Sequence, residues 1–135
     1  MNTLRLAAIL GFMAVLFGAM GAHALKTRVD PAIFSFFQTA ERLHWAHTLA
    51  LFGVGLLQLQ RPQWQLRNTV MAFCGGIVLF CGSLYALCGV AVLTGHNTLM
   101  LLRESPWFSL VHLTPMGGMV LLAGWALLTW RLFKH

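Results

Sequence analysis

The stretch VMAFCGGIVLFCGSLYALCGVAVL, from Val70 to Leu93, contains no charged residue and decides the class of fold. A membrane-spanning α-helix needs about 20 apolar residues to cross a hydrocarbon core of roughly 30 Å, and this run is long enough. The run is continuous and shows no alternation of apolar and polar residues, so a strand of a membrane barrel is not indicated. The stretch therefore predicts a transmembrane helix at about residues 69–94.

Three further apolar runs predict spans at about 4–25, 42–60 and 110–132. The predicted fold class is thus all-α, an integral-membrane four-helix bundle in which residues 1–135 form a single transmembrane domain. Asp30-Pro31 is typical of a helix start, because proline suits the first helical position. The segment 31–41 that follows is therefore a candidate interfacial helix lying along the membrane surface.

Composition supports a membrane protein and excludes several other classes. Hydrophobic residues make up 59% of the chain and charged residues only 9%, whereas a soluble domain carries about 25% charged residues. The formal net charge of +6 comes from basic residues that stand singly at the ends of apolar runs. This placement is typical of membrane-boundary anchors and offers no basic stripe for nucleic acid. We expect the lipid bilayer to be the main partner and the inner (plasma) membrane to be the location.

The end of the first run, GAMGAHALK, can be interpreted in two ways. Its residues Ala22-His23-Ala24 resemble the small-x-small site at which a signal peptidase cuts. However, Ala14, Gly18 and Ala22 also form a ridge of small residues, which lets helices approach closely in lipid. We therefore expect the first helix to be retained. With four spans, a slight excess of Arg and Lys on the side of the termini predicts that both termini are cytoplasmic.

Small residues recur along the predicted helices at spacings that indicate close packing. Cys-Gly occurs at 74–75, 81–82 and 88–89, and residues seven apart return to nearly the same helix face. Because they are about 10 Å apart along the axis, the three cysteines cannot bind one metal ion together. The positions expected to pack helices closely are Gly18, Gly21, Gly75, Gly82, Gly89, Gly117, Gly118 and Gly124. Pro115 is expected to kink the fourth helix.

A faint duplication is also visible in the sequence. Residues 15–17 and 78–80 both read Val-Leu-Phe, and they precede GAMGAHAL and CGSLYAL, respectively. The chain is therefore a candidate for two related helical hairpins.

Polar side chains near one end of the predicted bundle are the candidates for a site. The cluster expected there consists of His23, His47, Ser83, Tyr85 and His112. These residues could sit at the membrane interface, join the helices by hydrogen bonds, or bind a metal, a haem or a quinone. Only three acidic residues are present, so no catalytic set is evident, and the half di-iron spacing of Glu41 and His44 lacks a second half. We expect no catalytic residues, no metal site and no bound cofactor.

Four motifs in order resemble one known family along nearly the whole chain. They are GAMGAHALK, HTLAL, GGIVLFCGSLYAL and LTPMGGMVLLAGW. Their pattern is similar to that of small bacterial inner-membrane proteins related to transmembrane protein 256. The resemblance implies an uncleaved first helix and four membrane helices, and it supplies no biochemical activity. It covers Thr114, Pro115 and Trp125 among others, whereas His44-Trp45 departs from the residues usual in the family.

Three functions are consistent with these patterns. The first is a non-enzymatic membrane protein that acts by helix–helix association, as a homo-oligomer or as an accessory subunit of a membrane complex. The second is binding of a small molecule or redox cofactor at the histidine–tyrosine cluster. The third is a small transporter, which four spans could form only as an oligomer.

Overall fold

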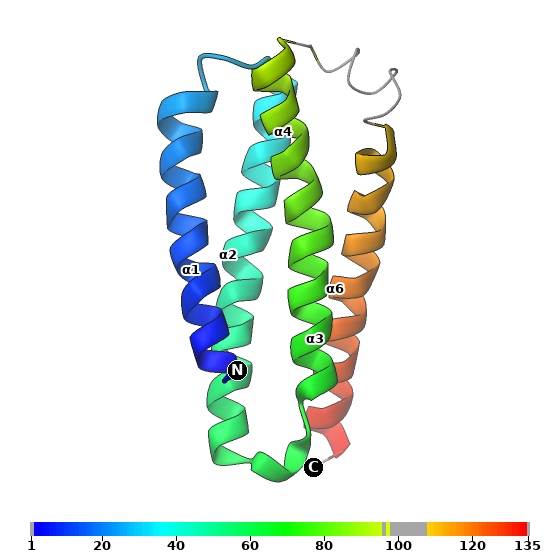
Figure 1. Cartoon of the computed structure of the whole chain (residues 1–135). Coiled ribbons are helices and arrows are strands. Elements are labelled where there is room, and N and C mark those ends of the chain that lie inside the picture. Colours follow the sequence, from blue (N-terminus) through cyan, green and yellow to red (C-terminus); the bar gives the residue numbers. More distant parts are fainter. Residues whose placement is uncertain (1, 96, 98–107, 135) are drawn as a thin grey trace.

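The computed structural model describes residues 2–95, 97 and 108–134, and helices account for nearly all of them. Four helical rods run side by side, and no β-strand occurs within the described residues (Figure 1). The all-α fold class predicted from the apolar runs is confirmed. The elements in chain order are α1 (Thr3–Met20), η1 (Gly21–Leu25), α2 (Pro31–Gln60), η2 (Pro62–Trp64), α3 (Arg67–Gly76), η3 (Ile77–Cys81), α4 (Gly82–Thr94) and α6 (Phe108–Lys134).

Two of the rods contain a π-helical turn. The turn η1 ends the rod that starts with α1, and the turn η3 joins α3 to α4 without interrupting the rod. Such turns insert an extra residue into the helix, rotate the side chains that follow, and are frequent at functional sites. The observed rods begin and end within two residues of the spans expected at 4–25, 69–94 and 110–132.

The second rod differs from its expectation in one respect. The candidate interfacial segment 31–41 and the expected span 42–60 form one continuous helix, α2. The Asp30 side chain accepts hydrogen bonds from the backbone N–H groups of Ala32 and Ile33, both at 2.9 Å, and so caps the start of this helix. Three rods are long and apolar enough to cross a membrane, and α2, which carries Glu41 and Arg42, is not among them.

The contacts between rods give an open arrangement. The helix α1 packs on α2, α2 packs on η3 and α4, and α6 packs on the α3–α4 rod (Figure 1). The chain thus forms two antiparallel hairpins that meet through α2 and the α3–α4 rod. This order leaves one groove between α1 and the α3–α4 rod and another between α2 and α6.

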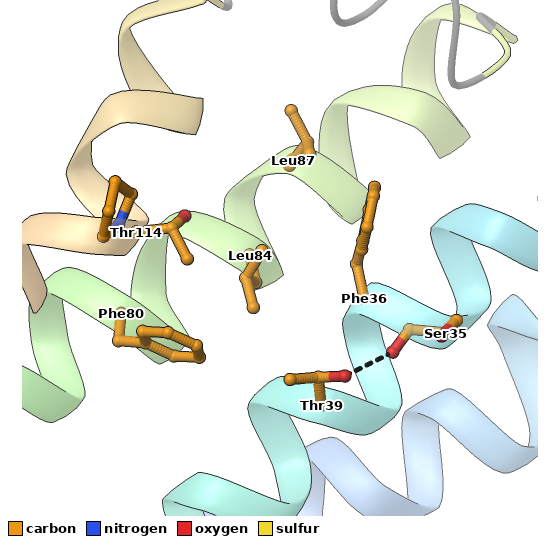
Figure 2. Close-up of a pocket in the computed structure, with 8 residues that line it drawn as sticks. Ser35, Phe36, Thr39, Phe80, Leu84, Leu87 and Thr114 are labelled. Carbon is orange, nitrogen blue, oxygen red and sulfur yellow. Dashed lines mark hydrogen bonds between the residues drawn. The ribbon is translucent and has the colours of Figure 1, made fainter. Parts of the chain in front are cut away.

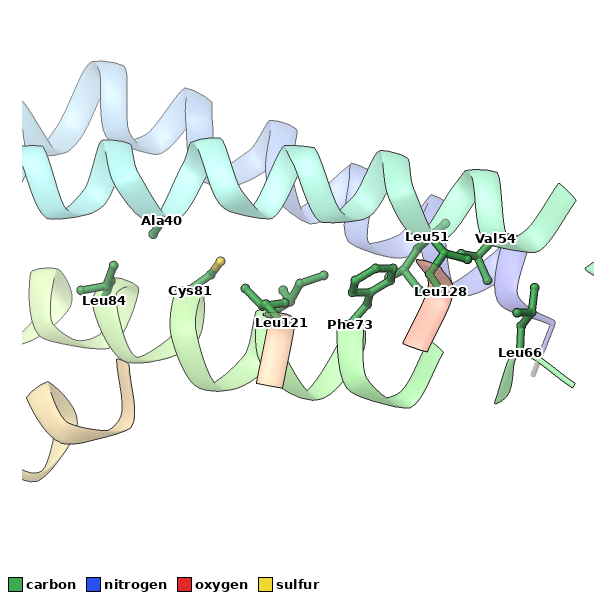
Figure 3. Close-up of a cluster of buried hydrophobic side chains, with 11 residues drawn as sticks. Ala40, Leu51, Val54, Leu66, Phe73, Cys81, Leu84, Leu121 and Leu128 are labelled. Carbon is green, nitrogen blue, oxygen red and sulfur yellow. The ribbon is translucent and has the colours of Figure 1, made fainter. Parts of the chain in front are cut away.

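The largest buried cluster fills the space where α2, the α3–α4 rod and α6 come together (Figure 3). Phe73 and Leu51 lie at its centre with no exposed surface, and Cys81 and Leu121 extend it along the rods. Within a bilayer, such a core is stabilised mainly by van der Waals packing, because lipid tails are as apolar as the side chains.

The outward faces of the rods carry large apolar side chains. Phe12 on α1, Leu49 on α2, Val78 on η3 and Met119 on α6 are each more than 60% exposed. A soluble monomer rarely exposes so much contiguous apolar surface. These faces are therefore suited to lipid.

Several glycines let neighbouring backbones approach closely. At Gly117, an added Cβ would lie 2.8 Å from the Cα of Phe80 in the adjacent rod, so no side chain fits there. A Cβ would also meet a neighbouring side chain at Gly18, Gly21, Gly55, Gly76 and Gly124.

The other glycines of the expected set have more space around them. Gly75 and Gly118 would make only ordinary contacts, and Gly82 and Gly89 have no atom within 4 Å of an added Cβ. On this rod Cys88 rather than its neighbour Gly89 faces α2, since the Sγ of Cys88 donates a hydrogen bond to the Ile33 carbonyl at 3.5 Å.

Candidate functional site

Two histidines on α2 are buried side by side in the middle of the molecule. His44 and His47 are three residues apart, and only 3% and 5% of their surfaces are exposed. Burying a polar group costs free energy unless the group is hydrogen-bonded. The partners of the four ring nitrogens therefore decide what each histidine can do.

The hydrogen bonds of His47 are complete. Its Nδ1 lies 2.7 Å from the carbonyl oxygen of Leu43, which can only accept, so Nδ1 carries the hydrogen and donates it. The Nε2 atom is then an acceptor, and the indole N–H of Trp125 donates to it at 3.1 Å. Phe73 packs edge-on against both rings, at centroid distances of 5.6 Å and 5.2 Å. His47 therefore ties α2 to α6, and it has no nitrogen left for a metal or a haem.

The hydrogen bonds of His44 are incomplete. Its Nδ1 lies 3.4 Å from the Tyr85 hydroxyl on α4, which is a long contact for a hydrogen bond. Its Nε2 is buried and makes no hydrogen bond to the described residues, although the Leu10 backbone on α1 lies close to the ring. Such a group costs about 1–3 kcal/mol while it stays unpaired.

Aromatic rings surround the His44–Tyr85 pair. The rings of Phe17 and Tyr85 are stacked, with centroids 4.5 Å apart and planes 26° apart. Phe37 also packs on Tyr85, with the ring centroids 5.2 Å apart. Residues from α1, α2 and α4 thus hold the phenol in place beside the imidazole.

The pair faces a cavity of about 300 Å³ in the groove between α1 and the α3–α4 rod. His44 and Tyr85 are its polar lining residues, and the apolar ones are Leu10, Met13, Phe17, Ile77, Val78, Cys81 and Gly82. The π-helical turn η3 supplies three of these apolar residues. Val78 is 67% exposed, so the cavity opens toward the outer surface of the rods, where lipid would lie.

The second groove, between α2 and α6, is larger, and two of the hydroxyl groups that line it already have hydrogen-bond partners. It contains adjoining cavities of about 550 Å³ and 460 Å³ that share Phe80 and Pro115. Figure 2 shows the larger one, where the Thr39 hydroxyl donates to the Ser35 carbonyl at 2.9 Å. The Ser83 hydroxyl nearby pairs with Thr114 at 2.7 Å and donates to the Phe80 carbonyl at 2.9 Å. These hydroxyls are already engaged and do not call for a ligand.

The five expected site residues do not form one cluster in the structure. Tyr85 lies beside His44, His47 is bonded to Trp125, and Ser83 is bonded to Thr114. His23 on η1 and His112 on α6 are exposed.

The residue that sequence reasoning left out of the set is His44. Its spacing from His47 was the available signal, but the spacing does not show which of the two has partners. Pro115 lies inside α6, and the helix continues through it.

Among the residues described, the fold does not bring metal-binding groups together. Within the part of the chain that the structure describes, no three His, Cys, Asp or Glu side chains lie close enough to hold a metal ion. Cys74, Cys81 and Cys88 are all free thiols. The His44–Tyr85 cavity is therefore the candidate site with a defined chemistry, namely hydrogen bonding to a small molecule.

Known proteins match the chain over most of its length. A family model described as a protein of unknown function (DUF423) matches residues 17–118. The UPF0382 inner membrane protein YgdD of Escherichia coli K12 is 34% identical over 90% of this chain and 82% of its own length. UPF0382 membrane proteins of Schizosaccharomyces pombe and Haemophilus influenzae are 33% and 32% identical, over 93% and 97% of this chain and 97% and 93% of their own lengths.

No solved structure matches the chain. The relatives confirm the family that the four sequence motifs predicted, and their names agree with the apolar outer faces of the rods, which contact the lipid bilayer. On the family model and on these identities, the chain belongs to the DUF423 (UPF0382) family of membrane proteins of unknown function.

Proposed function

We propose that the protein crosses the inner membrane four times and binds a small lipid-soluble molecule in the cavity beside His44 and Tyr85. Four crossings are supported by the position of α2, which lies between α1 and the α3–α4 rod and therefore shares their depth. With four crossings both termini lie on one side of the membrane, and the slight excess of basic residues there favours the cytoplasm.

The observation that carries the binding proposal is the unpaired Nε2 of His44. Ionisable residues inside a membrane protein are costly and mark functional sites more often than structural ones. The adjacent His47 shows that this fold completes the hydrogen bonds of a buried histidine where it serves packing alone. A bound molecule that pairs with the Nε2 of His44 would remove the penalty of that nitrogen and gain affinity in return.

The route into the cavity indicates the kind of molecule. The opening at Val78 lies on an apolar outer face, so a ligand enters sideways from the bilayer rather than from water. The walls are apolar apart from one polar corner, which is typical of small-molecule sites. The ligand is therefore apolar over most of its surface and carries one polar group.

Native mass spectrometry of the protein released from a mild detergent tests this proposal. The wild-type chain, of 15.0 kDa, should retain an added mass of a few hundred daltons, and His44→Phe should lose it. His23→Phe is the matched control, because it removes an exposed histidine outside the cavity. Identical occupancy in wild type and His44→Phe would contradict the proposal.

A second function, association with another copy or with another membrane protein, has its own support. Gly82, Ala86 and Gly89 form a small-residue seam on α4, and neither glycine is filled by a neighbour within the chain. Glycine costs a helix about 1 kcal/mol relative to alanine, so an unfilled glycine calls for a reason. Small seams of this spacing bring helices together in membranes.

The association function is tested separately by Gly89→Leu, because Gly89 does not line the cavity. If α4 is an interface, this change should shift the protein to a smaller assembly in cross-linking or native mass spectrometry. An unchanged assembly size and partner set would remove this function from consideration.

A further inference from the structure

We infer that the ligand of the His44–Tyr85 cavity is a planar carbonyl compound of the quinone class, held through one carbonyl oxygen. This inference rests on the proposed binding function and specifies the chemistry of its ligand. It follows from the hydrogens that the pair carries, from the one unpaired nitrogen and from the shape of the walls.

The first step is a count of hydrogens. A neutral imidazole carries one N–H and a phenol carries one O–H, so the pair owns two hydrogens that can be donated. The contact between the Nδ1 of His44 and the Tyr85 hydroxyl uses one of them, whichever atom is the donor. One hydrogen is always left over. The pair therefore has one hydrogen to donate in either tautomer, and a ligand that competes for it with the nearby Leu10 backbone must supply an acceptor.

The second step decides which atom offers that donor. If the Tyr85 O–H donates to Nδ1, the remaining hydrogen is on Nε2, the atom that has no partner. If Nδ1 donates instead, the free hydrogen is on the phenol, and Nε2 becomes a buried acceptor that would need a donor as well. A ligand that only accepts satisfies the first arrangement completely. A carbonyl oxygen accepts and cannot donate, whereas a hydroxyl does both.

The third step concerns shape. The aromatic side chains of Phe17 and Tyr85 line the cavity beside the polar corner, and Met13 and Ile77 add polarisable and aliphatic surface. Gly82 also lines the cavity and leaves space in it, with no atom within 4 Å of an added Cβ. A planar ring fits between such walls. An apolar tail on the ring would leave past Val78 into the lipid.

The test uses a short-tailed benzoquinone and an alkylbenzene with the same tail, which lacks the carbonyl groups. Binding to the purified full-length protein in detergent is measured by native mass spectrometry and by titration calorimetry. The wild type should bind the quinone at least tenfold more tightly than the alkylbenzene, because only the quinone pairs with the donor.

Four variants separate the contribution of the His44 donor to binding from the contribution of the cavity itself. His44→Phe should weaken quinone binding about tenfold and leave alkylbenzene binding unchanged, whereas His44→Gln, which keeps an N–H donor, should retain part of the preference. Gly82→Leu should block both probes, because a side chain at that position fills the cavity without disturbing the polar pair. Gly53→Leu is its matched control, because Gly53 also has no atom within 4 Å of an added Cβ and does not line the cavity, and it should bind both probes normally.

The outcomes separate this inference from the proposed function. If Gly82→Leu excludes both probes but the wild type binds them equally well, the cavity binds ligands and the carbonyl inference is wrong. The inference is also overturned if His44→Phe keeps the preference for quinone, since Nε2 would then be satisfied by the Leu10 backbone alone. If neither probe binds, or if Gly82→Leu has no effect on binding, the proposed binding function itself fails.

Discussion

His44 and His47 lie less than one turn apart on the same helix and are buried to the same degree, yet they are in opposite situations. Both nitrogens of His47 are hydrogen-bonded, one to its own helix and one to Trp125. His44 has one long contact and one nitrogen without a partner. Burial therefore does not distinguish a structural histidine from a ligand-binding one in this molecule. The hydrogen-bond partners of the ring nitrogens distinguish the two.

The comparison also separates stability from function. A completed polar pair between helices contributes to folding in a membrane, although the average contribution is only about 0.6 kcal/mol. An incomplete pair contributes less, or costs free energy, and a fold keeps it at the expense of stability. If this reading is correct, substitutions at the two histidines should have different effects on the empty protein.

The largest difference is expected between His47→Phe and His44→Phe. Phenylalanine at position 47 leaves the Trp125 N–H without its acceptor, so we expect a loss of about 1–3 kcal/mol in the free energy of unfolding. Phenylalanine at position 44 removes a nitrogen that has no partner, so we expect a change within about 0.5 kcal/mol, or a gain in stability. Unfolding by SDS in mixed micelles measures both variants in the absence of ligand.

Equal losses in the free energy of unfolding at positions 44 and 47 would contradict the difference between the two histidines. His44 would then be a structural residue, with its Nε2 bonded to the Leu10 backbone in the membrane. Thr48→Val provides a further reference, because the Thr48 hydroxyl is the other buried side-chain group without a partner among the described residues, and it does not line the cavity.

A smaller effect is expected for Trp125→Phe, which keeps the ring packing on Phe73 but removes the donor to His47. We expect a loss of about 1 kcal/mol. A double-mutant cycle with His47→Phe should give a coupling energy of about 1 kcal/mol, since the second change removes a bond that is already lost. A coupling energy near zero would show that the indole and the imidazole are not paired in the membrane.

The rods were largely predictable from the sequence because membrane helices are set by local properties. Uncharged runs of sufficient length predicted the ends of three rods to within two residues, and Asp30-Pro31 predicted the start of α2. The break expected within α2 does not occur. The polar residues Ser35, Gln38 and Thr39 of this segment are exposed, as expected for a surface segment. However, its apolar residues Ile33, Phe37 and Ala40 are buried against other helices, so the segment continues the packed helix.

The site was less predictable because it depends on how each helix is rotated. The expected ridge on α1 was Ala14, Gly18 and Ala22, whereas the buried small residues are Ala7, Ala14 and Gly21, and Ala22 is exposed. The π-helical turn η3 rotates the side chains that follow it, and no residue pattern in the sequence predicts this turn. A change of half a turn decides whether a histidine meets a partner or a cavity, and sequence spacing does not fix that rotation.

The smallest effect is expected for Tyr85→Phe in the protein without ligand. The hydroxyl makes a 3.4 Å contact, which is long for a hydrogen bond, and the ring keeps its stacking on Phe17 after the change. We therefore expect the free energy of unfolding to change by less than about 0.5 kcal/mol, measured as for the histidine variants. Ser35→Ala, which also removes one hydroxyl oxygen but from an exposed residue of α2, controls for the handling of the protein. A loss above about 1.5 kcal/mol would place Tyr85 and His44 in the same class as His47 and Trp125, because a pair that already holds two helices together has little need of a ligand.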